Sequence, residues 1–350
     1  DTSRYIKVVS VVDEGERADT YCAREPKRGM LLFNGVITSN CVEVIQYTEP
    51  NAIAATCDLA TINLVSFLKE DGSYDWHRLG QVTRQLVRNL DRVIDSTSGI
   101  IPNEGQRLLE SIIRDGSKGD PLYDLAKSMY GEIKKDITYT GRMMNRAIGI
   151  GKMGLGSLFA MMGLKYASNE ACDMADSICA CIYWHAIHES HLLAMEHGSY
   201  PSYQGSPMSK GILQFDMWKD EDQVMESYGL HNYGQGYLRR RSYDEVDPST
   251  FGVEEGWDYL RSLIKKGMRN SLLTCQMPNS TTAAIWGVTP SIEPFFACMH
   301  ASSNVAGNDA STYWAVIDVA KKEGVYDPVL MANYMAMNNG SIDGIHQYDP

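Results

Sequence analysis

Two cysteines and a glutamate near the start of the chain are candidates for redox or radical chemistry. Cys41 and Glu43 are two residues apart, and Cys57 follows Cys41 by sixteen residues. On an extended segment, residues i and i+2 point to the same side, so a thiol and a carboxylate would be presented together. This pattern suits a sulfur-centred reagent beside a general base, with Cys57 as half of a reducing dithiol. The alternative is that these cysteines are buried and inert.

A second candidate is a loop of small polar residues. Asn279, Ser280, Thr281 and Thr282 follow an apolar run at residues 271–275 and precede a helix-like stretch. At a strand-to-helix turn, their hydroxyls and the first backbone N–H groups would surround one point, which predicts an anion site favoured by the helix dipole. The alternative is N-capping by Ser280 or Thr281. The loop has no Walker lysine and is not a P-loop.

A histidine row invites a metal hypothesis. We favour a structural role for it, because no matching cluster of ligands stands elsewhere in the sequence. Cys172, Cys179 and Cys181 are interpreted in the same way, so the sequence predicts no metal site. The row consists of His185, His188, His191 and His197, with Glu189 among them.

Composition excludes several classes of protein. The 350 residues hold 32 Lys+Arg against 44 Asp+Glu, a net charge of −12, which argues against binding to nucleic acid or to an anionic membrane surface. The most apolar stretch, residues 153–164, is too short to span a bilayer, and no signal segment opens the chain. Eight irregularly spaced cysteines are not a secreted disulfide framework. We therefore expect a cytoplasmic globular protein.

Hydrophobic periodicity predicts the elements that position these residues. Helices are expected over residues 75–94 (with Asp75 as the cap), 155–162, 170–197 and 257–268. Strands are expected at 271–275 and, more weakly, at 213–215, and Gly149-Ile150-Gly151 is interpreted as a turn. Two stretches, near 101–140 and 219–254, are interpreted as loop-bearing insertions. Helices that alternate with short apolar runs favour an α/β fold.

The first forty residues differ from the rest. They contain β-type runs at 5–12 and 31–38, and the second run is interrupted by Asn34-Gly35. Asn-Gly is a strong hairpin signal, because both turn residues must accept positive φ. Residues 1–40 are therefore predicted to form a small all-β unit.

From Cys41 to Pro350 the chain resembles the C-terminal half of the large, catalytic subunit of class I ribonucleotide reductase. The likeness rests on motifs that occur in the family's order. They are Cys41-Val42-Glu43, the segments 57–64, 145–151, 203–218 and 269–273, Met277-Pro278 with its hydroxyl loop, and Ser291-Ile292-Glu293-Pro294.

This resemblance implies a ten-stranded α/β barrel that reduces ribonucleoside diphosphates by a thiyl-radical mechanism. Cys41 would be the thiyl radical, Glu43 the base for the 3′-OH proton, and Cys57 one member of the redox pair. Asn279, Ser280, Thr281 and Thr282 would hold the substrate diphosphate. The chain would bind no cofactor itself. A metal-containing small subunit would supply the radical, a thioredoxin- or glutaredoxin-type protein would supply electrons, and the complete large subunit would be a homodimer.

The sequence departs from the family pattern at its start. The family has Asn two residues before the radical cysteine, where this chain has Ser39, and residues 1–40 resemble instead the C-terminal segment of a split intein. Asn40 would then cyclise to release the segment, Cys41 would accept the acyl chain, and Cys22 would stand where some inteins carry an extra nucleophile. Inteins usually have His where Ser39 stands. The alternative is a divergent reductase strand pair.

We therefore expect two domains, an intein segment at 1–40 and the C-terminal half of a reductase barrel at 41–350. As written the chain would be inactive as a reductase, because it lacks the upstream barrel half and stops before the family's radical-transfer tyrosines. An N-terminal partner carrying the other intein part would complete it. Three alternatives stay open: a chain that acts mainly in trans-splicing, a non-catalytic reductase fragment, and a cobalamin-dependent class II reductase.

Overall fold

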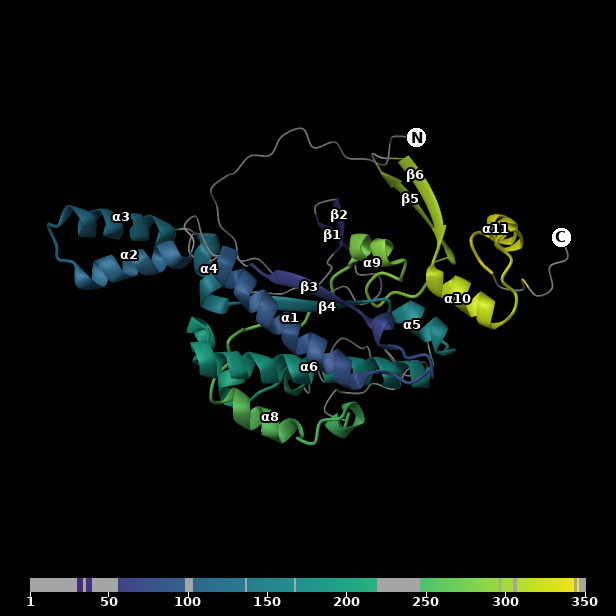
Figure 1. Ribbon diagram of the computed structural model, residues 1–350, viewed down its shortest axis with the longest axis horizontal. Helices are drawn as coiled ribbons and strands as arrows, with labels where there is room; N and C mark the ends of the chain where they lie inside the picture. The colour runs from purple at the N-terminus through teal and green to yellow at the C-terminus, as the bar shows by residue number, and fades with distance from the viewer. Residues whose placement is uncertain are drawn as a thin grey trace. The chain divides into compact units, whose positions relative to one another are not determined.

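The structure is a computed structural model, shown in Figure 1. It describes the backbone of residues 30–33 and 36–39, and residues 56–97, 103–135, 137–166, 168–218, 246–295, 297–304, 307–342 and 345. The chain divides into two compact units, Asp1–Ile45 and Gln46–Pro350.

The described part of the first unit is a β-hairpin. Strand β1 (Met30–Phe33) pairs antiparallel with β2 (Val36–Ser39), and Phe33 is the partner of Val36 at the closed end. Only two residues join the strands, as Asn34-Gly35 predicts. The hairpin is confirmed, whereas the β-type run expected at residues 5–12 lies outside the described residues.

The second unit is an α/β assembly. Its strands are β3 (Asp58–Asn63), β4 (Ile148–Met153), β5 (Met299–Asn304) and β6 (Gly307–Thr312). Its α-helices are α1 (Trp76–Thr97), α2 (Asn103–Asp115), α3 (Pro121–Lys135), α4 (Ile137–Asn145), α5 (Leu155–Met161), α6 (Asn169–His197), α8 (Trp257–Ile264), α9 (Ser280–Trp286), α10 (Trp314–Lys322) and α11 (Pro328–Met337).

A small parallel sheet organises this unit. Strand β3 pairs parallel with β4, from Asp58 opposite Ile148 to Asn63 opposite Met153. Residues 272–275 run along the other edge of β4, where the Ile150 N–H donates to Leu273 O (2.8 Å). The Cys275 N–H donates back to Ile150 O (3.2 Å). The strand expected at 271–275 is thus reduced to an isolated parallel bridge, in which Thr274 pairs with Ile150.

Two long helices cover one side of this sheet. In Figure 1, α1 and α6 lie on one side of β3 and β4, and α9 lies toward the other. Helix α1 packs against both strands and against α6, which in turn packs against α8. Asp75 caps α1 as predicted, because its Oδ1 accepts from the Arg78 N–H (3.1 Å). The apolar positions expected along α1 supply the core, except for Val93, which is exposed.

Four expectations from the sequence are corrected. Gly149-Ile150-Gly151 is the middle of the buried strand β4 and not a turn. Residues 213–215 form no strand, since Leu213 leads into a 3₁₀ helix (Gln214–Trp218) and its N–H donates to the Asp216 carboxylate (2.9 Å). The stretch at 101–140 is largely helical, with α2 and α3 packed on each other. Helix α8 also ends earlier than expected, at Ile264.

No helix in the described part of the chain is long and apolar enough to cross a membrane.

Candidate active site

One face of the parallel sheet brings together residues that lie far apart in the sequence. Leu59 is the register partner of Gly149, and Thr61 is the partner of Gly151, so these side-chain positions share one side of the sheet. We call it the glycine-lined face. It consists of Cys57, Leu59, Thr61, Gly149, Gly151, Cys275, Met277 and Asn279.

The two glycines of β4 make room for their neighbours. A Cβ atom on Gly149 would lie 2.6 Å from the Sγ of Cys275 and 3.3 Å from the Sγ of Cys57. On Gly151 it would lie 2.8 Å from the Cε of Met277 and 3.3 Å from the Nδ2 of Asn279. Real Cβ atoms do not approach heavy atoms at the shortest of these distances, so each glycine is required by what crosses over it.

Asn279 holds the loop against the carboxyl ends of β3 and β4. The Thr61 hydroxyl donates to Asn279 Oδ1 (2.6 Å), and Asn279 Nδ2 donates to Lys152 O (2.9 Å). Its backbone is left-handed, with φ 56°, a conformation that Asn tolerates better than most residues. The carboxyl ends of parallel strands are where ligands bind in α/β sheets.

The residues after Asn279 present donors outward. Ser280, Thr281 and Thr282 form the first turn of α9 and are exposed, while Ala283 is buried in the core. Asn279 makes no side-chain capping hydrogen bond. The first N–H groups of a helix have no partner within it. The turn therefore carries hydroxyls and backbone donors on an exposed surface, as an anion site needs.

Cys57 lies just before β3, at the opposite end of the same face. It is partly buried, and its Sγ lies 3.8 Å from Asp58 O. Burial raises the pKa of Asp58, and the Arg142 guanidinium, 3.4 Å from its carboxylate, acts in the opposite direction. Thr61 follows Cys57 by four residues, so in extended chain the two positions lie about 13 Å apart.

A buried polar cluster fixes β4 to the helices. Arg146 is 1% exposed and donates to the Asp91 carboxylate (2.7 Å) and to Asp95 (2.8 Å). Asn270 donates to Asp91 (3.1 Å) and to Arg146 O (3.1 Å), and Arg269 Nε lies 3.3 Å from Asp91. We call Asp91, Asp95, Arg146, Arg269 and Asn270 the ion-pair anchor. It joins α1 to the residues that immediately precede β4 and the 272–275 segment.

The structure brings some of the predicted site residues together. Cys57 and the loop from Asn279 to Thr282 belong to the described residues and lie along one sheet face. Cys41, Glu43, Asn40 and Cys22 lie outside the described residues. Thr61 and Cys275 were not predicted from the sequence, although both lie on the glycine-lined face. Thr61 lies in the 57–64 segment and Cys275 precedes the polar loop, but neither residue type carries a signal of its own.

The histidine row is built into the helical layer. His191 Nδ1 hydrogen-bonds to Gly267 O (2.9 Å), and the ring of His188 stacks on Trp184. Arg84 Nε donates to His185 Nδ1 (3.1 Å). Burial and the nearby Arg84 charge lower the pKa of His185 to about 3, so this ring is neutral at pH 7. Among the residues that the structure describes, no group of His, Cys, Asp and Glu side chains is arranged to hold a metal ion.

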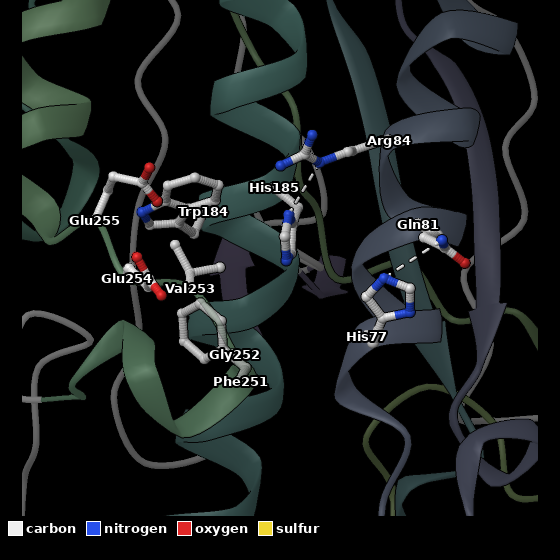
Figure 2. A pocket seen from close by; sticks show the side chains of 10 residues that line it. All are labelled: His77, Gln81, Arg84, Trp184, His185, Phe251, Gly252, Val253, Glu254 and Glu255. Carbon is white, nitrogen blue, oxygen red and sulfur yellow. Dashed lines mark hydrogen bonds between the residues drawn. The ribbon is translucent and has the colours of Figure 1, made fainter.

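A cavity of about 490 Å³ lies in this helical layer. Figure 2 shows the side chains that line it. His77, Gln81 and Arg84 of α1 face Trp184 and His185 of α6 across it, with residues 251–255 closing one side. None of the site residues predicted from the sequence lines it. The glycine-lined face is therefore the better candidate for chemistry.

Comparisons with known proteins identify the family of the chain. A family model described as "Ribonucleotide reductase, barrel domain" matches residues 31–349. The chain is 30% identical over 308 residues to a ribonucleoside-diphosphate reductase large subunit of Trypanosoma brucei brucei, covering 88% of this chain and 30% of that protein. It is 31% identical over 313 residues to a ribonucleoside-diphosphate reductase large chain of Cryptosporidium parvum, covering 89% of this chain and 31% of that protein.

A large subunit of Caenorhabditis elegans is 30% identical over 306 residues, which cover 87% of this chain and 31% of that protein. The chain thus spans less than a third of the length of these relatives. The family match begins at residue 31 and so takes in the β1–β2 hairpin. Its extent over residues 31–349 shows that the chain belongs to the ribonucleotide reductase barrel domain family.

Proposed function

We propose that residues 41–350 form part of the ten-stranded catalytic barrel of a class I ribonucleotide reductase, which reduces ribonucleoside diphosphates to 2′-deoxyribonucleoside diphosphates. The observation that carries the proposal is the placement of Cys57 and the Asn279–Thr282 loop along one glycine-lined face. A thiol at one end and an anion-binding turn at the other suit a substrate with a reducible sugar carbon and a diphosphate.

In this proposal each residue has its own role in the reaction. The Cys41 thiyl radical takes the 3′-hydrogen of the ribose, and Glu43 takes the 3′-OH proton. The 2′-hydroxyl leaves as water, while Cys57 and a second thiol on the N-terminal half provide two electrons and become a disulfide. Cys41 then returns the hydrogen to the 3′-carbon. A thioredoxin- or glutaredoxin-type protein reduces the disulfide, and a metal-containing small subunit generates the radical on Cys41.

The loop would bind the diphosphate through the N–H groups and hydroxyls of Ser280, Thr281 and Thr282. Charge-assisted hydrogen bonds of this kind are about twice as strong as neutral ones, and a helix N-terminus attracts negative charge. The hydrogen bonds from Asn279 to Thr61 and Lys152 support this role, because they fix the loop relative to the sheet. The complete large subunit, with its N-terminal half, would act as a homodimer.

The test uses the completed large subunit with its small subunit, assayed for deoxyribonucleotide formation. Cys57→Ser and Glu43→Gln are each expected to abolish turnover and to leave binding of a ribonucleoside diphosphate unchanged. Cys298→Ser is the matched control, because Cys298 belongs to a different hydrophobic cluster. Normal turnover of Cys57→Ser would show that Cys57 is not the reductant.

A second experiment tests the loop separately. Thr281→Ala and Thr282→Ala should raise the KM for a ribonucleoside diphosphate about tenfold each, as expected when one hydrogen bond to a charged group is lost. Ser262→Ala, which removes an exposed hydroxyl on α8, serves as the control. An unchanged KM in both threonine variants would remove the loop from the substrate site.

We also propose that residues 1–40 are the C-terminal segment of a split intein. The order Ser39-Asn40-Cys41 supports this function, because Asn40 can cyclise and Cys41 can accept an acyl chain by thioester exchange. Residues 1–45 also form a compact unit of their own. The start of the family match at residue 31 favours the competing hypothesis, in which the hairpin is part of the reductase.

Intact mass after mixing with the N-terminal partner tests the splicing hypothesis. Splicing predicts the loss of residues 1–40 and a ligated product that begins its C-terminal part at Cys41. Asn40→Ala should block this release, and Cys22→Ala tests whether the second cysteine takes part. An unchanged mass of the wild-type chain would mean that residues 1–40 are either an inactive intein or part of the reductase fold.

A further inference from the structure

The cavity between α1 and α6 is lined by charged groups of both signs that do not pair with each other. Arg84 lines it from α1, and Glu254 and Glu255 line it from the loop that follows the 3₁₀ helix Pro248–Phe251. Among the described residues that line the cavity, Arg84 is the only Lys or Arg, and no ion pair joins it to either glutamate. The cavity therefore keeps one cation apart from two carboxylates.

Arg84 is held in place by His185. Its Nε donates to His185 Nδ1 (3.1 Å), and this ring is neutral at pH 7, so it adds no charge to the cavity. The ring lies directly against Gly80 of α1, where a Cβ atom would collide with His185 Nε2. Because the bond to His185 uses Nε, the two terminal nitrogens of the guanidinium can bind a carboxylate in the bidentate manner.

An apolar surface separates the two charged ends. In Figure 2 the ring of Trp184 lies between Arg84 on one side and Glu255 on the other. The Arg84 Cζ lies 6.0 Å from the centre of the Trp184 ring, and the buried Phe251 ring also lines the cavity. Aromatic rings of this kind bury the methylene groups of a ligand. Glu254 and Glu255 are exposed, so a ligand can enter from solvent at their end.

We propose that this cavity binds a small ω-amino acid, a zwitterion whose carboxylate and ammonium groups are separated by a short chain of methylene groups. The carboxylate binds Arg84, and the ammonium group binds Glu254 and Glu255. The methylene groups lie on Trp184 and Phe251. An α-amino acid fits less well, because its two charges are on neighbouring atoms, whereas an aromatic ring separates the two ends of the cavity. The volume of about 490 Å³ is typical of small-molecule sites.

This site is separate from the glycine-lined face. Helices α1 and α6 lie on one side of β3 and β4, and α9 lies toward the other (Figure 1). Binding should therefore need neither Cys57 nor the loop at residues 279–282. Loss of the proposed reductase activity in Cys57→Ser would leave it unchanged, and absence of binding would leave the proposed reaction unaffected.

Isothermal titration of the full chain with γ-aminobutyrate, δ-aminovalerate and ε-aminocaproate measures the fit. Each is compared with the alkylamine and the alkanoate of the same chain length, such as pentylamine and caproate for ε-aminocaproate. One zwitterion should bind at least about tenfold more tightly than its two singly charged analogues, because each analogue loses the hydrogen bonds of one charged end. Absence of binding throughout the series, equal affinity at all three lengths, or equal affinity of zwitterions and analogues would overturn the proposal.

Substitutions test the two ends of the cavity separately. Arg84→Gln should weaken the best zwitterion at least about tenfold and should not weaken the alkylamine. Glu254→Gln combined with Glu255→Gln should weaken the zwitterion and the alkylamine and should not weaken the alkanoate. Arg92→Gln, at an exposed position of the same helix that does not line the cavity, is the matched control.

The two glutamates are exposed, so the double variant tests the site even where Arg84→Gln fails to fold. Unchanged affinity of the double variant for the zwitterion would overturn the proposal. So would an equal loss of affinity in Arg92→Gln, since the effect would then come from the net charge of the chain and not from the cavity.

Discussion

The ion-pair anchor and the glycine-lined face are close together along the chain but use polar groups differently. In the anchor, the Asp91 carboxylate accepts from Arg146, Arg269 and Asn270, and Asn270 is fully buried. On the face, Cys57 and Asn279 are only partly buried, and the hydroxyls of residues 280–282 are exposed. The Asp91 carboxylate of the anchor is hydrogen-bonded within the protein, whereas the hydroxyls of residues 280–282 on the face are exposed.

This difference separates two kinds of family motif. The pairs Asn145-Arg146 and Arg269-Asn270 carry the resemblance, but their side chains hold the fold. Arg146, Arg269 and Asn270 donate to Asp91 of α1, and Asn145 Oδ1 accepts from the Ser202 hydroxyl. Gly149 and Gly151 carry it as well, and they serve the site by leaving space for thiols and for Asn279. A motif of this family therefore does not by itself identify a catalytic residue.

The largest effect is expected in the anchor. Arg146→Ala should lower the free energy of unfolding by about 3–5 kcal/mol, because it leaves the Asp91 carboxylate buried and short of its main partner. Urea unfolding of the full chain measures this. Arg114→Ala is the control, since the Arg114–Asp115 pair is exposed and should contribute little to stability. Equal effects of the two substitutions would contradict the distinction between anchor and surface.

A smaller loss is expected on the glycine-lined face. Gly149→Ala would place a methyl group 2.6 Å from Cys275 Sγ and from Leu59 Cδ2, and such overpacking costs about 1–3 kcal/mol. The control is Gly131→Ala on α3, where the added Cβ meets nothing within 4 Å. That substitution should raise stability by about 0.5–1 kcal/mol, because Ala is the better helix former. A stabilising Gly149→Ala would mean that β4 does not need its glycine.

Helix α1, the hairpin and Gly149 show what the sequence could and could not predict. The period of Leu79, Val87 and Ile94 predicts α1, and Asn34-Gly35 predicts the hairpin, because both signals are local. Gly149 was interpreted as a turn residue. A glycine is needed there because the side chains of Cys57 and Cys275, on two neighbouring chain segments, occupy the space that a Cβ atom would need. Contacts between segments that are distant in the sequence cannot be predicted from local sequence patterns.

The same limit applies to the candidate site. Cys57 and the loop at 279–282 were found through residue type, spacing and the family resemblance. Thr61 and Cys275 were missed, because a threonine in a strand and a cysteine after an apolar run carry no signal of their own. Their significance comes from Asn279 and Gly149, which the sheet register places beside them.

The helical layer should also differ from the site in its response to acid. The pKa of His185 in the folded chain is about 3, below its unfolded value near 6.5, so the unfolded chain binds the extra proton as the pH falls below 6.5. Stability must therefore fall with the pH over this range. Between pH 7.5 and 5.5 the His185 contribution is about 1.4 kcal/mol, and His185→Gln should lose that much less on acidification. An identical pH dependence in wild type and variant would exclude His185 as the cause.

The smallest effect is expected from removal of one of the two hydrogen bonds that hold Asn279. Thr61→Val removes the donor to Asn279 Oδ1 and keeps the shape of the side chain, so the free energy of unfolding should fall by about 1 kcal/mol. The bond from Asn279 to Lys152 O remains, which limits the loss. Thr61→Ser restores the donor and should behave like wild type.

Substitutions of Asn279 distinguish the contribution of its backbone conformation from that of its side-chain hydrogen bonds. Asn279→Gly keeps the left-handed conformation at φ 56° and loses both side-chain hydrogen bonds, whereas Asn279→Ala loses the bonds and strains the backbone as well. Urea unfolding should therefore rank the variants, from most to least stable, as Thr61→Val, Asn279→Gly and Asn279→Ala. If Asn279→Gly matched wild type, the loop would be positioned by its backbone alone, and the two hydrogen bonds would add nothing to the site.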